Sequence, residues 1–559
     1  MSIISDKISK AQTVNSVEFK DLVSKYSSLG DSLCKNALEF HNKPFIIDYN
    51  EFGIRKEFSY IEFSIIVGKV SQYLNNKGIG IGDRVAIFAY NHWETVVQYF
   101  AIWSVGATVV PINSTEDDQR NEYIIKDSNS KLVFVRSEFL EKVKSIFKNI
   151  NKELLICVSG EKDVEYDFFT DLILNDNSKI FHPISNLLNQ ECMIVYTSGT
   201  TGNPKGVMLA HGNLLSDSKG ISECHKINNL TIMMCVLPIH HVNGTVVTIV
   251  TPMCSGSTVV LNRKFQTGLF FERLAKEKVN IVSVVPTLLA FLMQADIDIN
   301  KFDLTNFQHV ICGAGPLTCE LAISFEEKYN LKVIHGYGLS ETTCYSCFVP
   351  VDLNLFDHKK WMNNYGFPSI GVPIAQNEMD IQNEFGESLK EETKGEIVIR
   401  GHNVMLGYYN NDEANESSFK NNWFRSGDEG FFKFDSDSNK FFFITGRLKE
   451  LIIRGGVNIS PLEIDEVINS HIKVKAGITV AYENDIYGEE VGALVDKLDD
   501  SLTEEELIAY CREHLPFHKT PKVIIFSNNI PVTSTGKYQR NKVKYLFNDF
   551  KSIQFKDLK

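Results

Sequence analysis

Apolar runs and helix-like segments alternate along the first third of the chain. The runs at residues 84–90, 107–111 and 132–135 have the length of buried strands, and residues 93–103 have a helical pattern. Strands that alternate with helices are typical of a largely parallel, doubly wound sheet. Before them, residues 1–50 show only a polar, helical pattern. We therefore predict an α/β scaffold that begins after this segment.

The last part of the chain has a pattern of its own. Residues 460–463, Ser-Pro-Leu-Glu, predict a capping box with proline at the first helical position, and residues 503–506 predict a second capped helix. Apolar runs at residues 477–481 and 491–495 predict strands between the two helices. A stretch of about 110 residues with such a pattern is long enough for a domain. We predict a compact α+β unit at this end of the chain.

A loop rich in glycine and hydroxyl groups joins two apolar runs, residues 193–196 and 207–210. Glycine lets backbone N–H groups converge on one point, while hydroxyl groups and a lysine add donors and a positive charge. Pro204 and Gly206 stand where a Walker A sequence needs glycine and then serine or threonine. A plain glycine-rich hairpin is the alternative, but the number of donors favours a polyphosphate site. The donors and glycines are Thr197, Ser198, Gly199, Thr200, Thr201, Gly202, Lys205 and Gly206.

Three later strands run into polar or glycine-rich turns, at residues 238–244, 313–317 and 335–343. Side chains at the carboxyl edge of an α/β sheet lie where ligands bind. The last turn contains Glu341, a carboxylate of the type that holds Mg²⁺ beside phosphates. The alternative for its Ser-Glu-Thr sequence is a helix N-cap, and the two interpretations are compatible.

Three further positions are candidates for chemistry. Asp428 can accept two hydroxyl hydrogen bonds, as a ribose diol requires, although an isolated Gly-Asp is more often a surface turn. A strand pattern stops at Gly446, and the charged residues that follow it predict a domain boundary. Near the C-terminus, Lys537 follows a glycine in a turn, and such a lysine is in isolation usually solvated.

Composition restricts the function further. At 559 residues and 63.3 kDa the chain exceeds one ordinary core, so we expect two or more domains. The net charge of −13 argues against a general nucleic-acid or anionic-membrane binder. The longest apolar stretch, residues 281–293, is too short for a membrane span, and the first residues lack a secretion signal, so we expect a cytoplasmic protein. Cys344 and Cys347 form a CxxC without a second pair, which favours free thiols over a metal site.

Taken in order, these motifs resemble those of the adenylate-forming (acyl-activating) superfamily. The resemblance covers roughly residues 40–545 and is strongest toward AMP-forming acyl-CoA synthetases and coumarate-CoA ligases. It is carried by the phosphate loop Tyr-Thr-Ser-Gly-Thr-Thr-Gly-Asn-Pro-Lys-Gly at residues 196–206, the turns at 238–244, 309–317 and 335–343, the Trp-Phe-Arg-Ser-Gly-Asp sequence at 423–428, the hinge sequence at 441–454, and Pro-Val-Thr-Ser-Thr-Gly-Lys-Tyr-Gln-Arg at 531–540.

The resemblance implies a fold and a set of site residues. The fold is α/β, with a large N-terminal domain of doubly wound sheets plus a β subdomain (residues 1–447) and a small mobile α+β domain (residues 448–559). Lys537, Glu341 and His241 would be catalytic, and Glu341 would also hold the metal. Lys449 would be the hinge, and Gly455 and Gly456 would face coenzyme A. The implied nucleotide-binding residues are Thr197, Ser198, Gly199, Thr200, Thr201, Lys205, Gly313, Ala314, His335, Gly336, Tyr337, Ser340, Asp428 and Arg447.

Two positions depart from the family pattern. His240 stands where the family has phenylalanine, which makes the mouth of the acyl pocket more polar. Ser340 replaces the usual threonine and keeps its hydroxyl group.

The implied reaction joins a carboxylate to the α-phosphorus of ATP. Two anions at contact distance in a partly screened site repel each other by about 4 kcal/mol, and a cation that bridges them removes much of this cost. Lys537 would be that cation, while Mg²⁺ at Glu341 would stabilise the pyrophosphate. The small domain would then rotate, so that the thiol of coenzyme A attacks the acyl-AMP.

Two alternatives stay open beside an acyl-CoA synthetase. One is a free-standing adenylation enzyme that loads a carrier protein. The other is a non-catalytic nucleotide-binding regulator, against which the intact Lys205, Glu341, Asp428 and Lys537 argue. We expect the acid to be a fatty or related organic acid. Its chain length and the oligomeric state, monomer or homo-oligomer, are left open by the sequence.

Overall fold

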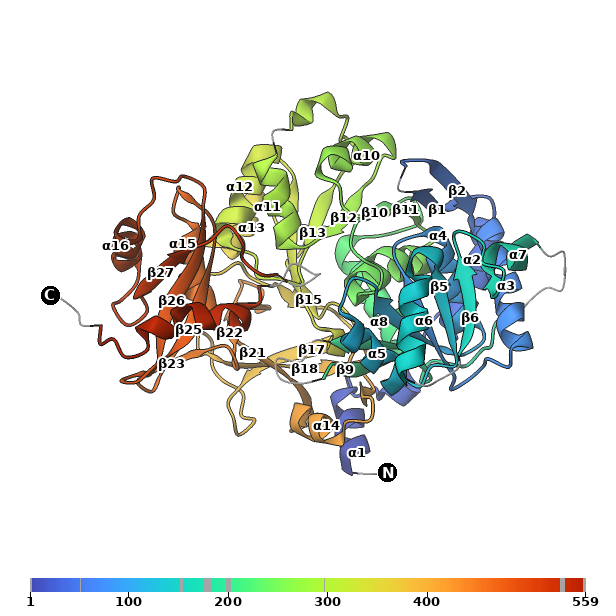
Figure 1. The fold of residues 1–559 in the computed structure, drawn as a ribbon, viewed down its shortest axis with the longest axis horizontal. Helices are drawn as coiled ribbons and strands as arrows, with labels where there is room; N and C mark the ends of the chain where they lie inside the picture. The colour runs from blue at the N-terminus through green and yellow to red at the C-terminus, as the bar shows by residue number, and fades with distance from the viewer. Residues whose placement is uncertain are drawn as a thin grey trace.

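The computed structural model describes residues 3–50, 52–150, 154–174, 182–197, 203–295, 297–532 and 538–555. Two large sheets form the body of the molecule (Figure 1). The first has the strand order β19-β9-β8-β4-β3-β5-β6-β7; it is parallel from β8 to β7 and antiparallel at β8–β9 and β9–β19. Its strands are β3 (Arg84–Ala89), β4 (Thr108–Asn113), β5 (Leu132–Arg136), β6 (Leu155–Ser159), β7 (Asp167–Phe168), β8 (Glu191–Thr197), β9 (Lys205–Ala210) and β19 (Gly407–Tyr408).

The second sheet has the order β16-β15-β14-β13-β12-β10-β11-β1-β2. Its strands from β14 to β1 are parallel; β2 is antiparallel to β1, β15 is antiparallel to β14, and β16 is antiparallel to β15. Its strands are β1 (Pro44–Tyr49), β2 (Arg55–Ser59), β10 (Ile232–Cys235), β11 (Thr258–Asn262), β12 (Ile281–Val284), β13 (His309–Cys312), β14 (Lys332–Tyr337), β15 (Cys347–Phe348) and β16 (Val372–Pro373).

Helices cover both faces of both sheets, because successive side chains of a buried strand point to opposite faces. In β3, Val85 and Ile87 belong to the core between the two sheets, while Ala86 and Phe88 belong to the outer core. Helices α2 (Leu29–Phe40), α3 (Tyr60–Asn76), α4 (Trp93–Ser104), α8 (His211–His225), α9 (Thr251–Ser255) and the π-helix η3 (Asn243–Val250) pack in the inner core. The outer faces carry α5 (Asp118–Asp127) and α6 (Leu140–Ile150) on one sheet and α10 (Phe270–Lys276), α11 (Pro286–Gln294) and α12 (Cys319–Tyr329) on the other.

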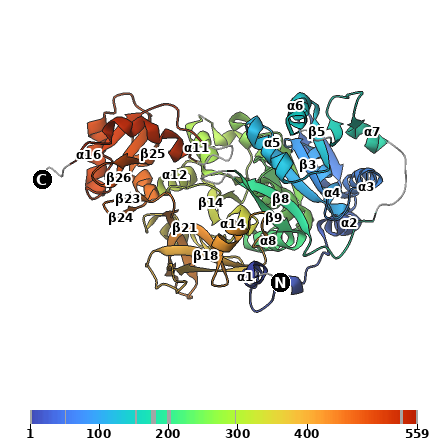
Figure 2. The ribbon, with the colours of Figure 1, turned by 60° about the horizontal axis from the view of Figure 1, so that its bottom comes forward.

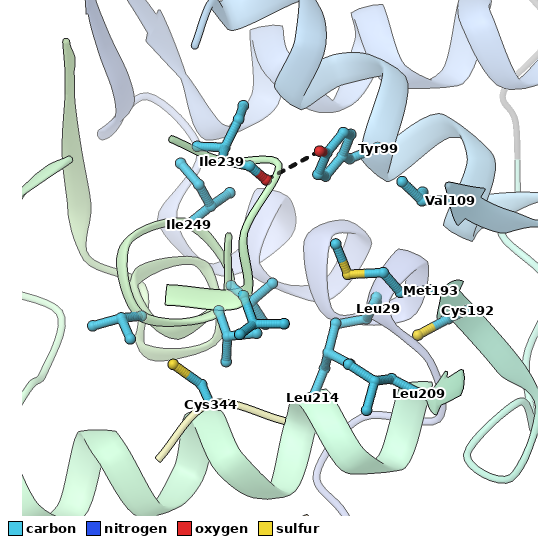
Figure 3. Close-up of a cluster of buried hydrophobic side chains, with 14 of the residues drawn as sticks. Leu29, Tyr99, Val109, Cys192, Met193, Leu209, Leu214, Ile239, Ile249 and Cys344 are labelled. Carbon is cyan, nitrogen blue, oxygen red and sulfur yellow. Dashed lines mark hydrogen bonds between the residues drawn. The ribbon is translucent and has the colours of Figure 1, made fainter. Parts of the chain in front are cut away.

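The inner core also fixes a turn of the site. The Tyr99 hydroxyl group of α4 donates to the Ile239 carbonyl at 3.0 Å, across the apolar side chains that the two sheets bury between them (Figure 3). Ile239 follows β10, so the helix behind one sheet holds the end of a strand in the other. The same carbonyl also accepts from the Thr245 hydroxyl group, so two buried hydroxyl groups satisfy it.

An antiparallel sheet forms a subdomain of the large domain. Its order is β17-β18-β21-β20, and β22 pairs with β21. The N-terminal helix α1 (Ile3–Ala11) and α14 (Asp412–Ser418) pack beside it (Figure 2). The strands are β17 (Asn377–Gln382), β18 (Gly395–Gly401), β20 (Phe419–Lys420), β21 (Trp423–Phe434) and β22 (Lys440–Arg447).

The chain leaves this sheet at Arg447 and enters another at Ile452. The C-terminal sheet has its own hydrophobic clusters and, with α15 (Pro461–Asn469) and α16 (Glu504–His514), forms the small domain at one end of the molecule (Figure 1). The predicted boundary after residue 447 falls in this connection and stays a prediction. The strands are β23 (Ile452–Arg454), β24 (Val457–Ile459), β25 (Val474–Asn484), β26 (Gly488–Lys497) and β27 (Val523–Phe526).

Two local predictions were wrong. Residues 1–50 are not only helical, because Pro44–Tyr49 forms β1, whose apolar side chains are buried against β11. Ser460 is the N-cap residue of α15 but makes no side-chain cap; its hydroxyl group donates instead to the Thr445 carbonyl of β22. In contrast, the Thr503 side chain caps α16 by accepting from the Glu506 N–H at 3.2 Å.

In the part of the chain that the structure describes, no helix combines the length and the apolar character needed to cross a bilayer.

Candidate active site

A cavity of about 1390 Å³ opens at the carboxyl ends of the parallel strands of the second sheet and continues between the two domains. Its position agrees with the prediction that ligand-binding side chains follow these strands. The cavity brings together the turns after β10 and β13, residues of β14, β21 and β22, and the small domain. Among its lining residues are His240, His241, Asn243, Ala314, His335, Gly336, Tyr337, Asp428, Arg447, Tyr538 and Arg540.

Asp428 lies at the wall of this cavity with its side chain fully buried. The Tyr337 hydroxyl group donates to its Oδ2 at 2.6 Å, and Arg447 Nε lies 3.1 Å from its Oδ1. Strand pairing creates this arrangement, since Asp428 of β21 is paired with Arg447 of β22. The negative charge of Asp428 raises the pKa of Arg447, and burial and Asp428 together raise that of Tyr337. Asp428 is therefore a fixed acceptor beside a permanent cation.

His335 lines the cavity as a neutral imidazole. Its Nδ1 lies 2.9 Å from the Ser369 carbonyl, to which an Nδ1–H can donate. Burial lowers its pKa to about 4, so the ring carries no charge at neutral pH. Gly336 follows it, and a Cβ there would lie 2.4 Å from the Phe348 ring. Glycine at this position lets β14 and β15 approach each other below the cavity.

The turn after β10 presents the two histidines. Asn91 holds this turn on both sides: the Ile239 N–H donates to its Oδ1 at 2.9 Å, and its Nδ2 donates to the Leu237 carbonyl at 2.9 Å. His240 and His241 follow, with ring centroids 4.4 Å apart, and both line the cavity. Burial lowers the pKa of His240 to about 4. The polar cavity mouth expected from His240 is thus built from an uncharged ring.

Tyr408 contacts both Lys205 and Glu341. The Tyr408 hydroxyl group donates to Glu341 Oε1 at 2.8 Å, and the Lys205 ammonium lies 5.0 Å from the centroid of the Tyr408 ring. Tyr408 belongs to β19, which pairs with β9 beside the predicted phosphate loop. Glu341 also contributes to the raised pKa of Arg447. The pair of Glu341 and Tyr408 therefore interacts electrostatically with the pair of Asp428 and Arg447.

The other predicted site residues differ in whether they line the cavity. Ala314 lines the cavity with a left-handed backbone, φ 63°, whereas Gly313 packs against Tyr345. Ser340 begins the short helix η6 (Ser340–Thr342) next to Glu341. Thr197 pairs with Lys205 at the base of the β8–β9 hairpin. Lys449 is exposed in the connection between the domains.

Gly455 and Gly456 form the turn between β23 and β24, where φ values of 56° and 85° require glycine. They are exposed and lie outside the described lining of the cavity.

Ser198, Gly199, Thr200, Thr201 and Lys537 lie outside the described residues. The residues that flank Lys537 are described: Val532 pairs with Tyr538, and both line the cavity that Asp428 and Tyr337 border.

Matches to protein families decide the identity. Residues 33–409 match the family model described as AMP-binding enzyme, and residues 463–537 match the model described as AMP-binding enzyme C-terminal domain. This chain belongs to the AMP-binding enzyme family. The resemblance to the adenylate-forming superfamily and the expected α/β fold are confirmed.

Relatives of this AMP-binding enzyme are named CoA ligases. The oxalate–CoA ligase of Arabidopsis thaliana is 30% identical over 491 residues, which cover 86% of this chain and 92% of that protein. The feruloyl-CoA synthase of an Amycolatopsis species is 29% identical over 490 residues, covering 88% and 94%. The fold is shared with ATP-bound MatB from Rhodopseudomonas palustris, with a TM-score of 0.83, 24% identity, and coverage of 94% and 100%. This chain is thus an AMP-forming acid–thiol ligase.

Sequence reasoning missed Tyr408 and Tyr345 in this AMP-binding enzyme. Tyr408 is 67 positions from Glu341, and only the pairing of β19 with β9 reveals its role. The Gly-Tyr-Tyr sequence at residues 407–409 was the one sequence feature that could have pointed to Tyr408. The segment from residue 348 to 365 had no assigned role; it contains α13 (Leu355–Asn363), whose Trp361 stacks on Phe441 of β22 at 3.9 Å.

Proposed function

We propose that this chain joins a short or polar carboxylic acid to coenzyme A through an acyl-AMP intermediate, with ATP as the source of AMP. The observation that carries the proposal is the buried Asp428, held by Tyr337 and Arg447 at the wall of the cavity. A carboxylate at the carboxyl edge of parallel strands, next to a guanidinium group, suits a ribose diol and an adjacent phosphate.

The other residues receive roles that agree with their surroundings. Arg447 at the cavity wall and Lys205 beside Tyr408 are cations, and we assign both to the phosphates of ATP. The neutral His335 and the glycine next to it border the nucleotide. His241 lies beside His240 at the cavity wall, on the side that we assign to the acid.

The residues at Glu341 fit a magnesium ion. Mg²⁺ is commonly bound by one or two carboxylates together with phosphates and waters. Among the described residues no group of three acidic, histidine or cysteine side chains could hold a metal, so an all-protein site is not present there. Glu341 is half-buried, and Tyr408 orients its Oε1, as a second partner commonly does for a metal-ligating carboxylate. When bound, the ion would neutralise charge on the departing pyrophosphate.

Lys537 is assigned to bridge the two anions that react. Val532 and Tyr538, the described residues on either side of residues 533–537, line the cavity, which supports the assignment of Lys537 to this site. Its ammonium group would offset the repulsion between the carboxylate of the acid and the α-phosphate of ATP. Once the acyl-AMP has formed, AMP leaves as the thiol attacks the acyl carbonyl.

A closed and polar wall supports a short or polar acid. Asn243 lines the cavity; its Oδ1 accepts from Ser283 at 2.8 Å, and its Nδ2 donates to the Tyr345 hydroxyl group at 3.2 Å. The Tyr345 ring fills the space behind this wall, so that a Cβ at Gly336 would lie 2.9 Å from it. A long alkyl chain would need that space. The expectation of a fatty acid therefore stays a prediction that a panel of acids can test.

The test is product analysis with oxalate, sulfoacetate, 4-coumarate, ferulate and hexanoate, each with ATP and either coenzyme A or no acceptor. We expect AMP and pyrophosphate, with the highest kcat/KM for oxalate or sulfoacetate, and a thioester only when coenzyme A is present. A thioester formed only on a carrier protein would support the alternative acceptor. A preference for hexanoate would contradict the role of the Asn243–Tyr345 wall.

A further inference from the structure

A carboxyl group on α15 connects the small domain to the large domain. The backbone N–H of Cys319 donates to both carboxyl oxygens of Glu466, at 3.1 and 3.3 Å. Cys319 is the first residue of α12, and the first N–H groups of a helix have no partner within that helix. Figures 1 and 2 both show α12 beside the small domain, and Glu320 and Leu321 of α12 line the cavity.

The surroundings of Glu466 are acidic. Its nearest charged neighbours include Asp465 on its own helix and Glu320 on α12, and Asp465 is itself bound to Arg540. Burial, together with Asp465 and Glu320, raises the pKa of Glu466 to about 8 against the opposing effect of the Cys319 N–H. Glu466 lies on α15 of the small domain and Cys319 on α12 of the large domain, so the hydrogen bond exists only while the two domains are docked. The contact is therefore specific to the docked arrangement of the two domains.

The docked arrangement presents one particular face of the small domain to the site. Val532, Tyr538 and Arg540 line the cavity together with Asp428. The turn at Gly455 and Gly456 is not part of the described lining. This orientation therefore places Val532 and Tyr538, which flank residues 533–537 in the sequence, in the same cavity as Asp428, and we assign it to acyl-AMP formation.

We propose that Glu466 is a positioning residue that holds the small domain in the orientation for acyl-AMP formation and must release Cys319 before the thioester step. The inference rests on the proposed function, because it assigns the docked state to one of the two half-reactions. It adds a docking point outside the segment that connects the domains.

The test compares variants on α15 in both half-reactions. Glu466→Ala removes the acceptor, and Glu466→Gln keeps one. Glu463→Ala is the matched control, because Glu463 is one turn earlier and binds Lys519 within the small domain, at 2.6 and 2.8 Å. One assay follows acid-dependent pyrophosphate release without coenzyme A. The other follows thioester formation from the corresponding acyl-AMP and coenzyme A. Both use the best acid of the panel.

We expect Glu466→Ala to lower the rate of pyrophosphate release about fivefold, as the loss of one hydrogen bond predicts. Glu466→Gln and Glu463→Ala should stay close to the wild type, and all variants should form the thioester at least as fast as the wild type. Equal pyrophosphate release by Glu466→Ala and Glu463→Ala would overturn the inference, as would an equal loss of both half-reactions in Glu466→Ala. If the wild type itself releases no pyrophosphate with any acid, the proposed function fails instead.

Discussion

Asp428 depends for its position on residues that lie on different strands. Tyr337 comes from β14 of the second large sheet, and Arg447 comes from β22 of the subdomain. The carboxylate thus joins two sheets at the wall of the cavity. Because Tyr337 and Arg447 each bind one of its oxygens, the carboxyl group of Asp428 keeps one orientation in the cavity.

At this scale the sequence predicted single residues better than their contacts. Asp428, Tyr337 and Arg447 were each predicted to bind the nucleotide, but nothing in the motifs indicates that they touch one another. Tyr408 was missed because its partner Glu341 is distant in sequence. Side-chain contacts across sheets depend on pairing that periodicity alone does not reveal.

The Tyr408 hydroxyl group can be tested by itself. Tyr408→Phe removes the donor to Glu341 and keeps the ring next to Lys205. We expect acid-dependent pyrophosphate release to fall about threefold to tenfold, the effect of losing one ordinary hydrogen bond of about 1 kcal/mol. Tyr409→Phe is the control, because that hydroxyl group accepts from Arg84 at 3.3 Å instead. Equal rates in the two variants would show that the Tyr408 hydroxyl group does not support Glu341 in the reaction.

At the scale of elements, strands inside the sheets were predicted well and their ends less so. The apolar runs at 84–90 and 132–135 correspond to β3 and β5, since both faces of these strands are buried. The capping box at Ser460 failed because a tertiary partner, the Thr445 carbonyl, takes the hydroxyl group. Local patterns predict an element, but a hydrogen-bond acceptor on a neighbouring element can bind the side chain that was expected to cap it.

The contact between α12 and α15 predicts a pH dependence. The pKa of Glu466 is raised in the docked state, so docking is favoured while Glu466 is protonated and is weakened as pH rises through about 8. Asp465, Glu320 and Cys319 are the titratable groups near it, and burial raises the pKa of the Cys319 thiol, which stays neutral. We expect the ratio of pyrophosphate release in wild type to that in Glu466→Gln to fall between pH 6.5 and 9, as glutamine cannot ionise. A constant ratio would show that Glu466 does not titrate in the docked state.

At the scale of the whole molecule, the site is completed by the relative position of two domains. The large domain contributes Asp428, Tyr337 and Glu341, and the small domain closes the cavity with Tyr538 and Arg540. The family motifs predicted the two parts and their order along the chain. They could not predict how the domains meet, because the Glu466–Cys319 contact lies outside every motif.

The central claim is that Lys537 acts in acyl-AMP formation and not in thioester formation. The most direct measurement is acid-dependent exchange of pyrophosphate into ATP by Lys537→Ala, compared with thioester formation from supplied acyl-AMP by the same variant. We predict that exchange falls at least about 100-fold, as for other groups that stabilise charge in a transition state, while thioester formation is largely retained. An equal loss of both activities, or the formation of ADP and orthophosphate by the wild type, would contradict the account.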